Sequence, residues 1–366
     1  MDYSKDKRVV LTLDAGGTNF VFSALKGYEE IIEPIKMKSN GNNLKKCLSN
    51  IVSGFSQMKD SLKGEKIVAI SFAFPGPADY PNGIIGDLGN LPGFRGGVAL
   101  GPMLQDAFKM PVFINNDGNL YAYGESIAGF LPEINKKLKQ SGSTKKFRNI
   151  VGITLGTGFG AGLITDGNMI VGDNSNAGEV WLLSSRHQPK RNAEEGVSIR
   201  AVQRHYAELS GRPADIMLSP ETIYKIGKGL TPGDKYAAIK SFEAMGKMLG
   251  DSLSNLATLF DGLIVIGGGI SGARDLFMPA VMKEMRSKYR NQKGEEYPRL
   301  AQKVFNLENE NDVKTFVAGD AKKVEVPVSG REVTYDSMQR IGIGFSKIGT
   351  SKAISIGAYV YALKNL

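Results

Sequence analysis

Short apolar runs that stop abruptly at glycine, proline or polar residues recur along the chain. The first, Val9-Val10-Leu11-Thr12-Leu13, ends in Asp14 and leads through two glycines into a second apolar run at 20–25. Runs of this length, rich in β-branched residues and bounded by turn residues, are typical of buried strands. The same pattern predicts strands at 67–74, 111–117, 150–155, 159–164 and 263–266.

Apolar residues at helical spacing occupy most of the stretches between these runs. In the segment 235–260 they include Ala238, Phe242 and Met245, which fall on one face of a helix. By the same criterion we expect helices at 44–62, 104–108, 122–130, 195–209, 275–289 and 353–366. The polar stretch 293–347 predicts little beyond short strands near 324–326 and 332–334.

The turn after the first strand has the chemistry of a phosphate site. Gly16 and Gly17 suit a tight turn that points consecutive backbone N–H groups outward, as a phosphate requires. Asp14 at the strand end can orient a hydrated Mg²⁺ ion, and Thr18 can donate its hydroxyl to a phosphate oxygen. An ordinary β-hairpin turn is the alternative, because short glycine motifs often arise by chance.

A second glycine turn repeats this arrangement. Leu155-Gly156-Thr157-Gly158-Phe159-Gly160 also lies between two apolar runs and also contains a threonine. The repetition indicates an internal duplication, with one such hairpin in each of two domains. Two phosphate turns that face each other across a cleft are less expected by chance than one.

Two further segments carry candidate chemistry. The loop 75–94 is rich in glycine and proline, which leaves its backbone free to wrap a ligand, although a plain surface loop is the alternative. Asn115, Asn116 and Asp117 close the run at 111–117. Because parallel sheets bind ligands at the carboxyl ends of their strands, these side chains are candidates for a binding site.

Composition narrows the class of protein. A chain of 366 residues suggests two domains of ordinary size. The formal net charge of +9 is partly concentrated in the segment 135–148, which we expect to be a solvated basic loop. Cys47 is the only cysteine, so no disulfide within the chain and no cysteine-based metal site can form. We expect a cytoplasmic protein with no membrane-spanning segment, because no apolar run approaches ~18 residues.

Taken together, the motifs resemble those of the ROK family of sugar kinases, within the actin-like and hexokinase-like fold group. The resemblance extends over nearly the whole chain. It rests on these segments: Asp14-Ala15-Gly16-Gly17-Thr18, Asn116-Asp117-Gly118-Asn119, Gly124-Glu125, Leu155 to Gly162, Ala177-Gly178-Glu179 and Ile266-Gly267-Gly268-Gly269-Ile270.

The resemblance implies an α/β protein with the two-domain actin-like/hexokinase-like (ribonuclease H-like) ATPase fold and a cleft between the domains. The first domain would comprise residues 1–120 together with a returning helix at 353–366. The second would comprise residues 121–352.

The resemblance also assigns roles to single residues. Asp117 would be the catalytic base that takes the proton from a sugar hydroxyl, usually the 6-hydroxyl, as that oxygen attacks the γ-phosphoryl group of ATP. A turn-forming acid after a strand is the alternative for Asp117. The expected sugar contacts are Asn90, Asn116, Glu179 and Glu194. The expected ATP and phosphate contacts are Asp14 (through a hydrated Mg²⁺), Gly16, Gly17, Thr18, Gly156, Thr157, Gly158, Gly160, Gly267, Gly268 and Gly269.

Two segments depart from the family pattern. Many members carry Glu-x-Gly-His where this chain has Glu179-Val180-Trp181-Leu182, so a polar contact to the sugar is lost at Leu182. Those members also carry a cysteine-rich zinc motif, whereas the corresponding segment here, 186–192, contains no cysteine. We therefore expect no structural zinc, and we expect His187 to be a surface residue.

The sequence thus predicts an ATP- and Mg²⁺-dependent kinase of a hexose or an N-acetylhexosamine. A sugar-responsive transcription regulator of the same family is one alternative, although Asp14 lies too early to leave room before it for a helix-turn-helix domain. An actin-like ATPase is another. We expect a small-molecule sugar and ATP as partners, with no nucleic acid and no membrane. A homodimer stays open, because nothing in the sequence marks an interface.

Overall fold

The computed structural model describes residues 3–89, 91–213 and 216–366, and these group into two compact units. Unit 1 takes its residues from 1–128, 168–177 and 348–366. Unit 2 takes its residues from 129–167 and 178–347. Each unit is built around one mixed sheet with helices packed on it, so the predicted α/β class is confirmed.

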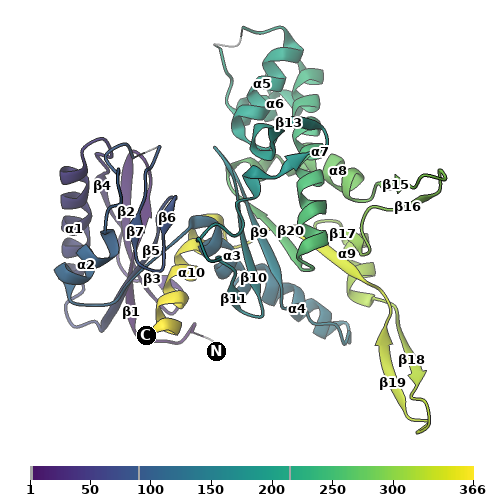
Figure 1. The fold of residues 1–366 in the computed structure, drawn as a ribbon, viewed down its shortest axis with the longest axis horizontal. Coiled ribbons are helices and arrows are strands. Elements are labelled where there is room, and N and C mark those ends of the chain that lie inside the picture. The colour runs from purple at the N-terminus through teal and green to yellow at the C-terminus, as the bar shows by residue number, and fades with distance from the viewer. Residues whose placement is uncertain (1–2, 90, 214–215) are drawn as a thin grey trace. The chain divides into compact units, whose positions relative to one another are not determined.

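The sheet of unit 1 has the strand order β3-β2-β1-β5-β8 (Figure 1). In addition, β4 pairs with the first half of β2, from Asn19 to Phe22. Its strands are β1 (Val9–Ala15), β2 (Asn19–Lys26), β3 (Glu29–Glu30), β4 (Ile35–Lys38), β5 (Ile67–Ala73) and β8 (Val112–Asn115). β1 and β2 form an antiparallel hairpin, whereas β1, β5 and β8 run parallel. A short hairpin of β6 (Ala78–Asp79) and β7 (Ile84–Ile85) follows β5, and β11 (Asn168–Met169) completes the strands of this unit.

Among its described residues, unit 1 has the helices α1 (Leu44–Ser61), α2 (Leu100–Phe108), α3 (Asp117–Ile127) and α10 (Thr350–Asn365). The backbones of α3 and α10 pack unusually close together. A Cβ atom at Gly124 would lie 1.9 Å from the carbonyl oxygen of Ala353, and one at Gly357 would lie 2.1 Å from that of Leu120. The small residues on the last helix therefore serve close backbone packing against α3.

The sheet of unit 2 contains the order β10-β9-β14-β20-β17. Its strands are β9 (Ile150–Leu155), β10 (Phe159–Thr165), β14 (Leu263–Gly267), β17 (Lys303–Asn306) and β20 (Arg340–Phe345). β9 and β10 form an antiparallel hairpin, and β9, β14, β20 and β17 run parallel. Both sheets thus pair an antiparallel hairpin with parallel strands, as the two glycine-turn hairpins of the sequence suggest.

The helices of unit 2 are α4 (Phe130–Gln140), α5 (Ile199–Ser210), α6 (Pro220–Gly227), α7 (Lys235–Leu259), α8 (Arg274–Met285) and α9 (Glu310–Ala318). Short 3-10 turns are η1 (Val180–Leu182), η2 (Ala193–Glu195) and η3 (Gly269–Ala273). The described part of the unit also contains two-stranded hairpins: β12 (Ser184–Ser185) with β13 (Gln188–Asn192), β15 (Lys288–Arg290) with β16 (Glu296–Pro298), and β18 (Ala321–Glu325) with β19 (Glu332–Asp336). The last two hairpins extend outward from the unit in Figure 1.

Several predicted boundaries are wrong. The helix expected at 122–130 begins at Asp117, because Asn116 caps it, and a second helix, α4, then covers 130–140. Lys136, Lys137 and Lys139 of the expected basic loop therefore lie on a helix, and only the later part of 135–148 is a loop. Within the described residues, no helix is both long and apolar enough to cross a membrane.

Candidate active site

The carboxyl edge of the parallel strands in unit 1 brings Asp14 and the segment 115–117 together. Asp14 of β1 is in register with Ala73 of β5, and Ala73 is in register with Asn115 of β8. Neighbouring strands are about 4.8 Å apart, so the backbones at Asp14 and Asn115 are separated by roughly 10 Å. Asp117 follows two residues later, so the two carboxylates share one edge of the sheet.

Asn116 and Asp117 start helix α3. The Asn116 Oδ1 atom accepts hydrogen bonds from the backbone N–H groups of Gly118 (2.8 Å) and Asn119 (3.4 Å), which is an N-cap. Its amide N–H₂ group is a donor that this cap does not use. Asp117 is the first helical residue, and its Oδ1 atom accepts the Gly118 N–H at 2.9 Å.

The surroundings of both carboxyl groups favour the protonated form. Asp117 is exposed to solvent, but crowding by neighbouring protein atoms still desolvates its carboxyl group; this is the largest effect on its pKa and raises it, and the nearby Asp14 carboxylate raises it further. The hydrogen bond from the Gly118 N–H opposes this shift. Desolvation also raises the pKa of Asp14. A carboxylate with a raised pKa is a stronger base, which suits Asp117 to removing a proton from a hydroxyl group.

The turn that contains Gly16, Gly17 and Thr18 is held from outside its own hairpin by a buried serine. The Ser39 backbone N–H donates to the Thr18 carbonyl oxygen at 3.0 Å, and the Ser39 hydroxyl donates to the Gly17 carbonyl oxygen. The side chain of Thr18 is exposed. Sequence reasoning missed Ser39, because a single serine between a strand and a helix gives no pattern that links it to a turn earlier in the chain.

In unit 2 the two predicted ATP segments lie at one edge of the sheet. Gly267 at the end of β14 is in register with Thr154 near the end of β9. Gly268 has φ +89°, and a Cβ atom there would lie 2.3 Å from the Leu155 carbonyl oxygen, so only glycine fits. The turn from Gly156 to Gly160 therefore lies beside the segment from Gly267 to Gly269.

Glu194 is bound to the second glycine turn. Its Oε2 atom accepts the Phe159 backbone N–H at 3.1 Å, and its Oε1 atom accepts a hydrogen bond from Arg200 at 2.9 Å. A Cβ atom at Gly158 would lie 2.7 Å from Glu194 Oε2, so the glycine makes room for this carboxylate. Arg200, the second residue of α5, is a partner that sequence reasoning did not identify.

Glu179 lies just before the 3-10 turn η1, where its carboxylate accepts a hydrogen bond from the indole N–H of Trp181. Leu182, which stands where many family members have a histidine, exposes 57% of its surface. The Ala193 N–H donates to the Leu183 carbonyl oxygen at 2.8 Å, so the segments that carry Glu179 and Glu194 are adjacent.

The predicted site residues therefore fall into two groups, each placed within its own unit. The carboxyl edge of unit 1 holds Asp14, Gly16, Gly17, Thr18, Asn116 and Asp117. Unit 2 holds Gly156, Thr157, Gly158, Gly160, Glu179, Glu194, Gly267, Gly268 and Gly269. Asn90 lies outside the described residues.

A buried ion cluster braces the segment before Glu194. The Arg299 guanidinium, 2% exposed, pairs with Asp251 of α7 and Glu284 of α8, and Arg186 pairs with the same two acids. Asp251 Oδ2 also accepts the Arg186 backbone N–H at 3.0 Å and the Ser185 hydroxyl at 3.1 Å. The cluster thus fastens the β12–β13 hairpin to α7 and α8.

The expectation that His187 is a surface residue is wrong. Its side chain is 19% exposed, and its Nε2 atom lies 3.4 Å from a Glu284 oxygen. The acidic neighbours come from α7 and α8, far along the chain, so the sequence around His187 gave no sign of them. His187, Asp251 and Glu284 could offer three metal-ligand atoms within 4.8 Å of one another. Two guanidinium groups already neutralise the two acids, so the residues as they stand do not fit a metal ion.

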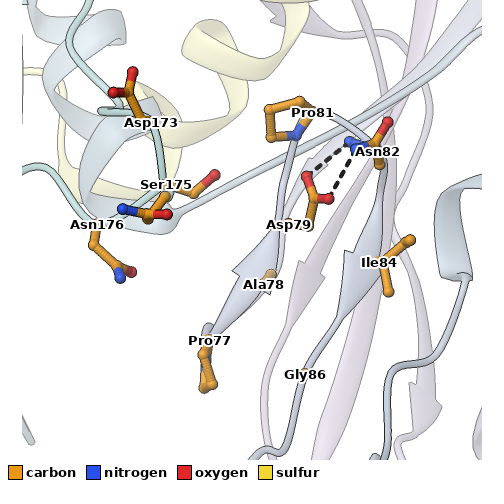
Figure 2. A pocket seen from close by; sticks show the side chains of 11 residues that line it. Pro77, Ala78, Asp79, Pro81, Asn82, Ile84, Gly86, Asp173, Ser175 and Asn176 are labelled. Carbon is orange, nitrogen blue, oxygen red and sulfur yellow. Dashed lines mark hydrogen bonds between the residues drawn. The ribbon is translucent and has the colours of Figure 1, made fainter.

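A separate pocket of about 680 Å³ opens in unit 1 between the β6–β7 hairpin and the segment 173–176 (Figure 2). Its walls are mostly short polar side chains and prolines. They belong to Pro77, Ala78, Asp79, Pro81, Asn82, Ile84, Gly86, Asp173, Asn174, Ser175 and Asn176.

Comparison with known proteins gives matches over most of the chain. The sequence model of the ROK family matches residues 10–310. A glucokinase of Halalkalibacterium halodurans is 26% identical over 75% of this chain and 84% of that protein. A β-glucoside kinase of Listeria monocytogenes is 25% identical over 76% of this chain and 88% of that protein.

Solved structures agree with these sequence matches. A glucokinase from Parabacteroides distasonis is 51% identical, covers 100% of both chains and superposes with a TM-score of 0.92. A ROK family glucokinase from Streptomyces griseus, solved with glucose and AMPPNP, has a TM-score of 0.61 at 17% identity and covers 96% of this chain and 98% of its own. At that identity the second match bears on the fold alone. The matches confirm the predicted resemblance and fold class.

Proposed function

The chain belongs to the ROK family, and from this premise we propose that it is an ATP-dependent hexose kinase that converts glucose into glucose 6-phosphate. The full-length similarity to a glucokinase at 51% identity supports the reaction class and favours glucose over other hexoses. The first curated relative is also a glucokinase.

One structural observation supports the proposed phosphoryl-transfer chemistry. The strand register places Asp14 and Asp117 at one edge of the unit 1 sheet, and the pKa of Asp117 is raised. A kinase that transfers a phosphoryl group to an alcohol needs a base at the alcohol and a separate site for the phosphates. Asp117 has the properties expected of the base. Asp14 and the Gly16–Thr18 turn have the properties expected of a site that binds the phosphates.

In the proposed reaction the Asp117 carboxylate accepts the proton of the 6-hydroxyl group while that oxygen bonds to the γ-phosphorus of ATP. The bond from the γ-phosphorus to the bridging oxygen breaks at the same time, and ADP leaves with the electron pair. The Asn116 amide N–H₂ group and the carboxylates of Glu179 and Glu194 orient the remaining sugar hydroxyls, since a carboxylate accepts two hydroxyl hydrogen bonds.

The remaining predicted roles belong to the same proposal. The turns at Gly16–Thr18 and at Gly156–Gly160, apart from the Phe159 N–H that Glu194 accepts, donate backbone N–H groups to phosphates, and Gly267–Gly269 lets adenosine lie against the backbone. Mg²⁺, when bound, offsets the negative charge of the phosphates, and a carboxylate such as Asp14 fits that ion through water. Residues 1–120 with 353–366, and residues 121–352, are the proposed functional domains.

A coupled ADP-release assay over glucose, mannose, fructose, N-acetylglucosamine and N-acetylmannosamine tests the substrate. We expect the highest kcat/KM for glucose, and a product that glucose-6-phosphate dehydrogenase oxidises. A higher kcat/KM for an N-acetylhexosamine would refute glucose as the acceptor. ATP hydrolysis that no sugar changes would favour an actin-like ATPase, and sugar binding without any turnover would favour a sugar-responsive regulator.

A further inference from the structure

A basic pocket of about 460 Å³ opens in unit 2 at the amino ends of its parallel strands. Its lining includes residues at the starts of β9, β14, β17 and β20, namely Asn149, Asp261, Gln302, Gln339 and Arg340. The glycine turns lie at the carboxyl ends of β9 and β14, which is the opposite edge of the same sheet. Asn149 and Gly156 are separated by the extended strand β9, so roughly 23 Å lies between the pocket and the proposed ATP turn.

The lining carries positive charge that the protein itself leaves largely uncompensated. Lys145, Lys146 and Arg148 come from the end of the basic segment 135–148, and Asp261 is the one carboxylate among the described lining residues. Neither lysine forms an ion pair within the described part of the chain. Arg148 lies 3.4 Å from Asp166, but their side chains are 63% and 70% exposed, so water screens this pair. The pocket therefore favours an anionic ligand.

The backbone that carries these cations is fixed. The Phe147 N–H donates to Asn135 Oδ1 and the Phe147 carbonyl oxygen accepts from Asn135 Nδ2, both at 2.9 Å. The buried Phe147 ring stacks on Phe316 with ring centroids 5.5 Å apart. The Lys145 ammonium lies 5.5 Å from the centroid of the Phe147 ring. A site held in place before binding loses less conformational entropy when a ligand arrives.

The floor of the pocket adds neutral and buried polar groups. The Arg340 side chain is 0% exposed and pairs with Asp336 at 2.7 Å, yet its buried Nε has no hydrogen-bond partner among the described residues. Buried donors are nearly always paired, so this one indicates an acceptor from outside the chain. Gln302 donates to Asp261 at 2.9 Å through its amide nitrogen, which leaves the amide oxygen to accept a hydroxyl. The exposed Gln339 offers a second amide.

We propose that this pocket binds a phosphorylated small molecule, with the phosphoryl group against Lys145, Lys146 and Arg148. Lysine binds phosphate as a point charge, and arginine can donate two parallel hydrogen bonds to it. The hydroxyls of an attached sugar face the amides of Gln302 and Gln339. A volume of about 460 Å³ lies within the range of 300–1,000 Å³ that small-molecule sites occupy. The site is separate from the proposed ATP turns, and its occupation does not depend on the proposed kinase reaction.

The test measures the rate at which N-hydroxysuccinimidyl acetate acetylates each lysine of the full-length protein, followed by mass spectrometry. Glucose 6-phosphate, inorganic phosphate and glucose are added separately at constant ionic strength, so that general screening does not differ between samples. Lys136 and Lys139 are internal controls, because they are exposed in the same basic segment but do not line the pocket. Calorimetric titration with glucose 6-phosphate compares Lys145→Ala/Lys146→Ala with Lys136→Ala/Lys139→Ala, which removes the same charge.

We expect glucose 6-phosphate to slow acetylation of Lys145 and Lys146 at least threefold, with Lys136 and Lys139 unchanged and glucose without effect. The Lys145→Ala/Lys146→Ala variant should lose one site for glucose 6-phosphate in the titration, and the control variant should keep it. Equal protection by inorganic phosphate would support the site and show that the phosphoryl group suffices.

The site is refuted if neither anion slows acetylation of Lys145 and Lys146, if all four lysines are slowed alike, or if both double variants bind as the native protein does. Failure of the proposed kinase function would instead appear as absent turnover with these acetylation rates unaffected.

Discussion

Replacing Arg299 by methionine tests how the ion cluster of unit 2 stabilises the protein. The guanidinium is 2% exposed and pairs with Asp251 and Glu284, whose side chains are 3% and 7% exposed. Methionine removes the positive charge and the hydrogen-bond donors but keeps an unbranched side chain of similar reach. Two buried carboxylates then share Arg186, which is 38% exposed and sits at 3.7 Å from Asp251.

The loss of one partner from a buried ion pair destabilises proteins by about 3–5 kcal/mol, because a charge stays buried without compensation. Arg186 remains as a partial partner, so we place the effect at the lower end, about 3 kcal/mol. For a unit of roughly 200 residues each kcal/mol lowers the melting temperature by about 2–4 °C. The expected decrease is therefore about 6–12 °C.

The assay is thermal unfolding followed by circular dichroism, with Arg290→Met as the matched control. Arg290 of β15 pairs with Glu296 of β16 in the same hairpin, but the Arg290 side chain is 74% exposed, so water and salt screen that pair. We expect no measurable change in the control. If Arg299→Met lowers the melting temperature no more than Arg290→Met, the argument from burial is refuted.

The same variant has a pH signature. Burial alone would raise the pKa of Asp251, but the hydrogen bonds from Arg299 and from the Arg186 backbone together hold it below its usual value. A carboxyl group with a lowered pKa stabilises the folded state above its unfolded pKa, near 4, and this contribution is lost as the pH falls through the folded pKa. The stability difference between the native protein and Arg299→Met should therefore shrink as the pH falls below about 4.

Three further predictions follow from particular contacts. Gly357→Ala places a methyl group 2.1 Å from the Leu120 carbonyl oxygen, so we expect a loss of about 1–3 kcal/mol in denaturant unfolding, and an unchanged midpoint would contradict the packing of α3 on α10. Burial raises the pKa of the Cys47 thiol to about 11, so a thiol reagent at pH 8 should label Cys47 only after denaturation, and rapid labelling of the native protein would refute its burial. The raised pKa of Asp117 predicts that kcat/KM falls with decreasing pH at values above the ordinary carboxyl range near 4, and a profile flat down to pH 4 would exclude Asp117 as the base.

The sheets and their glycine turns could be predicted because their signals are local. The strands at 9–13, 150–155 and 263–266 are continuous apolar runs bounded by turn residues, and the structure has β1, β9 and β14 there. The two short strands expected near 324–326 and 332–334 are present as β18 and β19, although β18 begins earlier, at Ala321, and their pairing into a hairpin was not predicted. The roles predicted for the site residues stay predictions, since placement at a sheet edge does not by itself measure binding.

The missed elements depend on contacts far along the chain. β20, Arg340-Ile341-Gly342-Ile343-Gly344-Phe345, contains two glycines that lower its strand propensity. A Cβ atom at Gly342 would lie 2.4 Å from Leu307, and one at Gly344 would lie 2.3 Å from Phe130, so close packing demands glycine at both positions. Local propensity cannot reveal such a requirement.

The ion cluster was missed for a related reason. Arg186, Asp251, Glu284 and Arg299 come from four separate segments, and each looks like an ordinary surface charge in the sequence. Folding brings them together in a buried position beside His187. The start of α3 at Asp117 was missed for a different reason. Asn116 is a recognisable N-cap residue, but the apolar run before it was interpreted as a strand that continued to Asp117.

The most direct test of the central claim is the rate of phosphoryl transfer to glucose by Asp117→Asn, measured beside Asp106→Asn. Asp106 is an equally conservative control, because its side chain is 87% exposed on α2 and only weakly paired with Lys109. We predict that Asp117→Asn lowers kcat by roughly 10²–10⁴-fold, the usual contribution of a general base, while glucose binding measured by calorimetry is retained. Asp106→Asn should be as active as the native protein. A kcat for Asp117→Asn within a few fold of native would show that Asp117 is not the base and would contradict the account.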